Sequence, residues 1–241
     1  MPQQPTAHTV KSFDEEIDQL RSLIGQMGGM AGAQISEAVD ALFRRDAEAA
    51  LKVVARDAEL DAMEQEAERL AVAIIALRAP MADDLREIVA ALKISAVIER
   101  IGDYGKNIAK RVPVLTQAAP IGPSVIIPEM ARAASAMIRD ALDAYVDRDA
   151  DLARQVMERD QQVDDFYNSL FRSLLTYMME NPHHITPSAH LLFIAKNLER
   201  VGDHATNIAE MVYFSVTGQH LAERTKADRT TSITAAADEE D

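Results

Sequence analysis

Two short segments of this sequence repeat one pattern of acidic, basic and small residues. ERIGDYGKNIA begins at Glu99 and ERVGDHATNIA begins at Glu199, and seven of these eleven positions are identical. In an α-helix, residues four positions apart lie on the same face. The glutamate, the aspartate and the asparagine of each segment therefore form one line of oxygen-bearing side chains, which suits metal ions and partner contact better than bond chemistry.

A second acidic pair with the same spacing precedes each segment: Asp57 with Asp61, and Asp160 with Asp164. Antiparallel neighbouring helices would bring the two pairs of each half together. Such a concentration of like charge is costly unless cations neutralise it. We therefore predict metal ligands in both halves, namely Asp57, Asp61, Glu99, Asp103, Asn107, Asp160, Asp164, Glu199, Asp203 and Asn207.

A hydrated helix surface whose acids pair with arginine is the alternative interpretation. The pattern occurs on two helices in each half and continues apolar stripes, which favours a binding role. Oxygen ligands suit Mg, Mn, Fe or Ca ions, and Zn would also accept them, so the metal stays open, as does the choice between a metal site and a docking surface. His204 has Tyr104 at its matching position and is left out of the set.

Both segments also carry a glycine at the same place in the motif, namely Gly102 and Gly202. A glycine inside a helix costs about 1 kcal/mol relative to alanine, so the pattern indicates that something approaches the backbone there. Either a ligand or a tightly packed neighbouring helix would explain it.

Enzyme motifs are missing from the sequence. It contains no Gly-x-Ser-x-Gly segment and no Walker loop, and no nucleophile or oxyanion-binding set accompanies the paired carboxylates. We therefore predict that the protein is not an enzyme. The alternative, which rests only on the clustered carboxylates, is a metal-dependent hydrolase of phosphate compounds.

Composition narrows the fold and the partners. Of the 241 residues 48% are hydrophobic, 5% are aromatic and none is cysteine, which favours helices and excludes disulfides and thiolate metal sites. The net charge of −14 disfavours nucleic acid and anionic lipid. The longest aliphatic run, LAVAIIAL, is far shorter than the ~20 residues of a membrane span, and the sequence starts without a signal-peptide pattern. We expect a cytoplasmic protein with no nucleic-acid partner and no direct membrane insertion.

Capping signals and prolines divide the chain into six long helices. Ser12 and Glu15 form a capping box before a helix that reaches residue 44, and Asp83 and Thr186 are read as the caps of later helices. The predicted helices span 12–44, 46–77, 83–112, 128–146, 149–180 and the residues from 187 onward, with a proline-rich linker at 113–128.

The two halves are copies of one unit. Besides the segments above, which are 100 residues apart, residues 38–61 align with residues 141–164 at a separation of 103. We predict an all-α fold of two tandem, sequence-related antiparallel three-helix bundles at 8–117 and 124–220, followed by a disordered acidic tail at 221–241.

The segments PMADDLREIVAALKISAVIERIGDYGKNIA from Pro80 and ITPSAHLLFIAKNLERVGDHATNIAE from Ile185 closely resemble the PhoU family of phosphate-transport accessory regulators. The resemblance covers nearly the whole chain to about Tyr213. It implies two three-helix bundles side by side. It also implies a negative regulator of phosphate uptake and of the phosphate-starvation response, acting as a metal-binding adaptor.

The implied partners are the ATP-binding subunit of a Pst-type phosphate ABC transporter and a membrane sensor histidine kinase, which would recruit the protein to the inner face of the membrane. We also expect a homodimer. In the PhoU family the Glu/Asp-x-x-x-Asp motifs are associated with multinuclear metal clusters, and the ten residues named above stand at the matching motif positions.

Overall fold

The structure is a computed structural model that describes residues 6–220, with side chains from residue 12 onward, so the predicted tail at 221–241 lies outside the described residues. All elements of the described part are helical. The long helices are α1 (Thr6–Arg44), α2 (Ala47–Arg78), α3 (Asp83–Ala109), α5 (Ile127–Asp147), α7 (Asp160–Glu180) and α8 (Ile185–Thr217). Shorter elements are α4 (Val112–Leu115), α6 (Ala150–Glu158) and the 3₁₀ turns η1 (Gly122–Ile126) and η2 (Pro182–His184).

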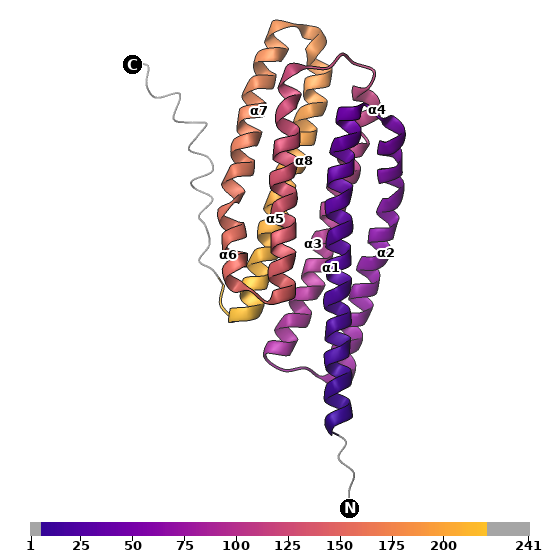
Figure 1. The fold of residues 1–241 in the computed structure, drawn as a ribbon, viewed down its shortest axis with the longest axis vertical. Helices are drawn as coiled ribbons and strands as arrows, with labels where there is room; N and C mark the ends of the chain where they lie inside the picture. The colour runs from indigo at the N-terminus through magenta and orange to yellow at the C-terminus, as the bar shows by residue number, and fades with distance from the viewer. Residues whose placement is uncertain (1–5, 221–241) are drawn as a thin grey trace, which may run out of the picture.

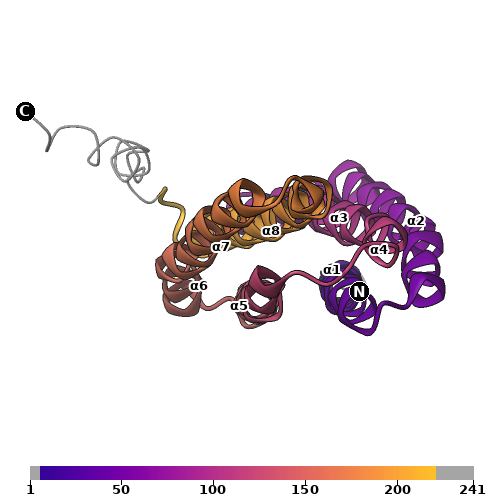
Figure 2. The same cartoon turned by 90° about the horizontal axis from the view of Figure 1, so that it is seen from above.

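The helices form two antiparallel bundles that lie side by side (Figures 1 and 2). One bundle contains α1, α2 and α3, and the other contains α5, the α6–α7 pair and α8. Two helix pairs, α3 with α8 and α1 with α5, make the junction between them. The all-α prediction and the prediction of two tandem bundles are confirmed.

The periodicity of the apolar residues explains this packing. On α3, Ile94, Ile98 and Ile101 are fully buried at helical spacing, and Ile194 and Val201 of α8 are buried at the matching positions. One hydrophobic core runs through both bundles. Of the helices within residues 6–220, none has the length and apolar composition needed to cross a bilayer.

The first helix begins earlier than predicted. It starts at Thr6, so Ser12 lies inside it and the predicted capping box is wrong. The hydroxyl of Ser12 instead accepts a hydrogen bond of 2.6 Å from Arg78 at the end of α2. Arg78 also binds Glu16 at 2.6 Å. These polar side chains of α1 therefore join two helices rather than end one.

The third helix also differs at both ends. It begins at Asp83 itself, which pairs with Arg86 at 2.7 Å and does not cap the helix. It ends at Ala109, three residues before the predicted end, because Pro113 has no amide hydrogen to donate to the carbonyl of Ala109. The chain then forms the short helix α4.

The predicted helix at 149–180 is divided at Arg159. Around this residue the amide of Arg159 donates to Val156 O at 3.1 Å, and the amide of Gln162 donates to Arg159 O at 3.0 Å. Bonds of this i to i+3 type tighten the helix locally. The last helix begins at Ile185, so Thr186 lies in its first turn and is not its cap.

The glycines of α1 do not break the helix. A Cβ at Gly28 would overlap Leu142 of α5, whereas Cβ atoms at Gly25, Gly29 and Gly32 would meet nothing within 4 Å. A hollow of about 350 Å³ lies along this part of the α1–α5 contact. Close helix packing therefore requires glycine at only one of the four positions.

Candidate functional site

Helices α2 and α3 bring the predicted acids of the first half together. We name Asp57, Asp61, Glu99 and Asp103 the first acidic cluster. Asp57 is only 5% exposed, and Glu99 is half-buried. Burial raises the pKa of the Glu99 carboxyl, and the charges of Asp103, Glu64, Asp61 and Asp57 raise it further. Each of the other three acids of the cluster is therefore close enough to repel Glu99.

A lysine supplies the cation that this cluster needs. Lys106 Nζ donates hydrogen bonds to Asp57 and, at 2.7 Å, to Asp103 Oδ1. Hydrogen bonds to these two carboxylates raise the pKa of Lys106. Asn107 is exposed, and no contact links it to the acids among the described residues. The structure thus groups four of the five residues predicted for this half.

The second acidic cluster consists of Asp160, Asp164, Glu199 and Asp203. Asp160 is 3% exposed, and its Oδ1 lies 3.5 Å from the position that a Cβ at Gly202 would take, which places it against α8. Glu199 is only 14% exposed in its side chain, and its Oε1 accepts a hydrogen bond of 2.6 Å from Lys196. Its Oε2 is buried and receives no hydrogen bond from residues 12–220.

Asn207 is exposed in this half as Asn107 is in the other. Its Nδ2 lies 3.3 Å from His204 Nδ1. Both asparagines predicted as ligands are therefore exposed side chains.

The two lysines were missed by sequence reasoning. Lys106 has Thr206 at its matching position in the other half, and Lys196 has Ala96. Each lysine stands three positions from an acid of its own helix, a spacing at which side chains meet. That spacing was the available signal, and it shows that the halves neutralise their acids from different positions.

The carboxylate oxygens have the right chemistry for hard metal ions, but their present arrangement holds lysine. Within the described residues, no group of three or more His, Asp or Glu side chains is arranged to hold a metal ion. A metal ion at the first cluster would compete with Lys106 for Asp57 and Asp103.

Two motif positions meet at the centre of the molecule. Tyr104 of α3 and His204 of α8 stack with ring centroids 5.4 Å apart, and the Tyr104 hydroxyl lies 3.0 Å from His204 Nε2. Burial lowers the pKa of His204, and the charge of Arg100 lowers it further. The matching positions of the two repeats therefore contact each other across the junction.

The repeated glycines contact protein side chains. A Cβ at Gly102 would overlap Leu60 and lie 2.8 Å from Gln34 Oε1, both of which are buried. A Cβ at Gly202 would lie 3.4 Å from Val163, an ordinary van der Waals distance. Close packing of a neighbouring helix thus explains Gly102, while Gly202 has room for a methyl group.

Replacement of Gly102 and of Gly202 by alanine should have opposite effects on the free energy of unfolding. Gly102→Ala is expected to lower the free energy of unfolding by about 1 kcal/mol, because overpacking outweighs the gain in helix propensity. Gly202→Ala should raise it by up to about 1 kcal/mol. Urea unfolding of both variants measures the difference, and equal stabilisation of the two would show that neither position is limited by its neighbours.

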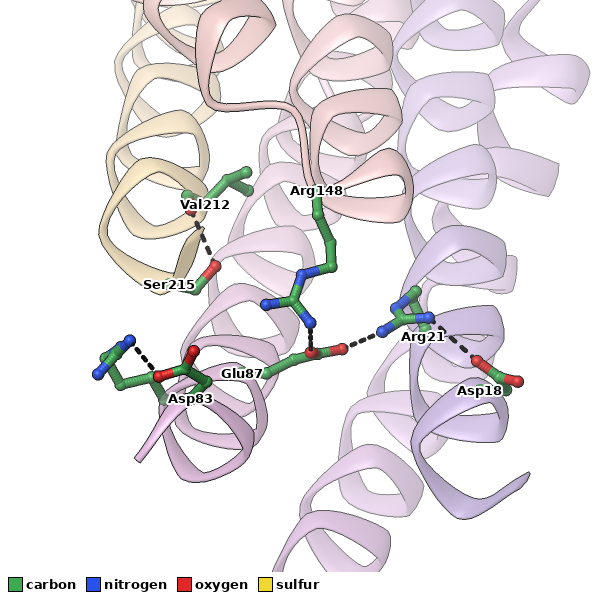
Figure 3. Close-up of polar contacts among 8 residues, drawn as sticks. Asp18, Arg21, Asp83, Glu87, Arg148, Val212 and Ser215 are labelled. Atoms are coloured by element: carbon green, nitrogen blue, oxygen red, sulfur yellow. Dashed lines mark hydrogen bonds and ion pairs between the residues drawn. The ribbon is translucent and has the colours of Figure 1, made fainter. Parts of the chain in front are cut away.

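A third charged group lies at the junction of the bundles, where α3 begins (Figure 3). Glu87, 7% exposed, accepts hydrogen bonds from Arg21 of α1 and from Arg148 of the α5–α6 turn, the latter at 2.7 Å. Tyr145 is buried beside them, and burial and the charge of Glu87 raise its pKa. One carboxylate thus links two helices of the first bundle to a turn of the second.

Comparisons with known proteins agree with the duplication. Residues 24–112 and 127–212 each match the family described as PhoU domain. The chain is 54% identical over 219 residues to the phosphate-specific transport system accessory protein PhoU homolog of Zymomonas mobilis, which covers 91% of this chain and 92% of that protein. The Caulobacter vibrioides homolog is 49% identical, over 92% of this chain and 98% of that one.

Two solved structures share the fold. The crystal structure of PhoU from Pseudomonas aeruginosa has a TM-score of 0.82 and 37% identity, covering 86% of this chain and all of that one. The phosphate transport system regulatory protein PhoU from Streptococcus pneumoniae has a TM-score of 0.80 and 26% identity, covering 88% of this chain.

Proposed function

This chain belongs to the PhoU family, and we propose that it is a cytoplasmic negative regulator of phosphate uptake and of the phosphate-starvation response. The observation that carries the proposal is the match of both halves to one family, together with extensive identity to relatives named as accessory proteins of the phosphate-specific transport system. A role in regulating phosphate transport follows from that membership.

The proposed mode of action is protein contact rather than catalysis. The chain would join the ATP-binding subunit of a phosphate ABC transporter to a membrane sensor histidine kinase, and so lie at the inner face of the membrane. Two observations support contact. The described part consists of long helices that offer extended surfaces, and the net charge of −14 suits basic protein surfaces.

We also propose that the two acidic clusters bind metal ions such as Mg, Mn, Fe or Zn through their carboxylates. A metal ion would supply positive charge to oxygens that repel one another. The raised pKa of Glu99 supports this, because it reflects an unfavourable concentration of negative charge. Lys106 and Lys196 hold the same carboxylates and would have to give way.

Deletion of the gene tests the regulatory function. In phosphate-rich medium, expression from a phosphate-starvation promoter should rise severalfold, because the kinase is no longer restrained. Reintroducing the parental chain should restore low expression, and deleting the kinase as well should remove the increase. Unchanged expression in a strain with an intact transporter and kinase would overturn the proposal.

A further inference from the structure

A small pocket lies at the end of the junction opposite Glu87. It has a volume of about 190 Å³, and its walls come from the end of α1, α4, the linker and the start of α8. Leu42, Leu115 and Leu191 are among its apolar residues, and of the residues that the structure describes, Arg45 is the only charged one in its lining. We name it the Arg45 pocket.

The guanidinium of Arg45 is held in place by the linker. Arg45 has a left-handed backbone (φ 56°), and its Nη2 donates to Thr116 O at 2.6 Å and to Ala118 O at 2.8 Å. A guanidinium has five N–H donors. Within the described residues, the side-chain hydrogen bonds of Arg45 both come from Nη2, and no carboxylate pairs with the guanidinium. A fixed cation with donors to spare therefore borders the pocket.

The internal repeat shows what such an arginine can hold. At the separation of 103 residues, Arg45 aligns with Arg148, which has the same left-handed backbone (φ 54°). The α1–α2 and α5–α6 turns that carry them lie at opposite ends of the contact between α1 and α5 (Figure 1). Arg148 donates to the buried carboxylate of Glu87. The position that matches Glu87 on α8, at the separation of 100, is Pro187, and Pro187 lines the Arg45 pocket.

The residues around Glu87 also have smaller counterparts around the Arg45 pocket. Tyr145, buried beside Glu87, is replaced by Leu42, and Arg21 is replaced by Ser124. Both replacements are smaller, and both line the Arg45 pocket. The pocket therefore occupies the place that a carboxylate and its surroundings fill at the other end of the junction.

The size and rim of the pocket indicate its occupant. A volume of about 190 Å³ lies below the ~300–1,000 Å³ of typical small-molecule sites, and suits a single side chain. Phe43 lines the pocket and is 42% exposed, which gives a neighbouring apolar side chain a surface to contact. The arginine selects an anion, and a carboxylate matches its planar fork.

We propose that the Arg45 pocket receives an acidic side chain of a protein partner, whose carboxylate binds Arg45 as Glu87 binds Arg148. An apolar residue next to that acid lies on Phe43. The inference rests on the proposed function in one respect, namely that the chain works by contact with the transporter subunit or the kinase.

The test introduces the residues that surround Arg148 at the matching positions around Arg45. Pro187→Glu supplies a carboxylate to Arg45 from within the chain, and Leu42→Tyr fills the space. Both full-length variants should fold with unchanged or higher Tm, and should bind the purified ATP-binding subunit or kinase at least about tenfold more weakly than the parental chain does. Arg148→Gln is the matched control at the other end and should leave partner binding within about threefold. If the parental chain, P187E and L42Y bind the partner equally well, the proposed role of the Arg45 pocket is wrong, while the adaptor function is still supported.

A second measurement does not depend on the partner. The full chain with labelled Leu and Ile methyl groups is titrated with the peptide N-acetyl-Leu-Glu-amide and with its glutamine analogue. The methyl signals of Leu42, Ile121 and Leu191 should shift when the glutamate peptide is added. The glutamine analogue should bind at least about tenfold more weakly. In P187E, neither peptide should shift these signals. No shift in the parental chain would overturn the inference. If neither purified protein binds the parental chain, the adaptor function fails, and this titration alone decides the pocket.

Discussion

Replacement of Glu87 by alanine is expected to lower the free energy of unfolding by about 2–3 kcal/mol. The carboxylate is buried and accepts hydrogen bonds from Arg21 and Arg148 at once. Loss of one member of a buried ionic group leaves the others without a counter-charge, which costs about 3–5 kcal/mol when all are buried. The expected value is smaller because the arginine side chains are 22% and 44% exposed.

Urea unfolding at neutral pH measures this cost, and Glu16→Ala is its matched control. Glu16 also pairs with an arginine of another helix, Arg78, but within one bundle and with a 29% exposed side chain. Its loss should cost about 1 kcal/mol or less. A double-mutant cycle of Glu87→Ala with Arg148→Ala isolates the contact between bundles. Equal costs at Glu87 and Glu16 would show that the junction gains nothing from its buried carboxylate.

The helices of this fold could be predicted from sequence because their apolar residues recur with the helical period. Ile94, Ile98 and Ile101, and their counterparts on α8, identify the buried faces. The helix ends were harder to predict, since a polar residue near a terminus has competing uses. Ser12 reads as a cap, yet Arg78 reaches it from the far end of another helix, 66 residues away in the chain.

For the candidate site, the sequence predicted which acids share a helix face but not which side chains meet between helices. The spacing of Glu99 and Asp103 on one helix, and of Asp57 and Asp61 on another, shows which side chains share a face. The register between the two helices depends on side-chain packing across them, which the sequence does not display. For this reason Lys106 was missed: only the packed structure shows that it reaches Asp57 as well as Asp103.

Glu87 illustrates the same limit. In the sequence it is an acidic residue near the start of a helix, where negative charge is common. Its two arginine partners are 66 and 61 residues away. The duplication adds information here, because the place that matches Glu87 in the other half is Pro187 and borders a pocket. Comparison of the repeats thus identifies where the two halves have diverged toward different contacts.

The acidic clusters show a second divergence, and it leads to the other large predicted effect. Replacement of Lys106 by methionine keeps most of the side-chain volume and removes the cation between Asp57 and Asp103. Without metal ions, the variant should be less stable by about 2 kcal/mol, because the buried Asp57 loses its partner. If the first cluster binds metal as proposed, Mn²⁺ should bind the variant at least about tenfold more tightly and raise its Tm.

The pH dependence of this cost has a definite sign. Because the pKa of Lys106 is raised in the folded chain, its contribution is complete below the unfolded value of about 10.4 and is lost only as the pH rises beyond that. The difference between Lys106→Met and the parental chain should therefore stay constant from about pH 7 to 9 and shrink in more alkaline solution.

Lys52→Met is the control for the loss of a lysine. Lys52 pairs with Glu48 on the surface of α2, where both side chains are more than 70% exposed, so its removal should leave the stability essentially unchanged. Chemical unfolding with EDTA and calorimetric titration with Mn²⁺ give the two measurements. A Lys106→Met chain as stable as the parent would refute the counter-ion role of the lysine. A destabilised variant that binds no Mn²⁺ would show instead that the first cluster is closed by lysine alone, which would leave metal binding to the second half.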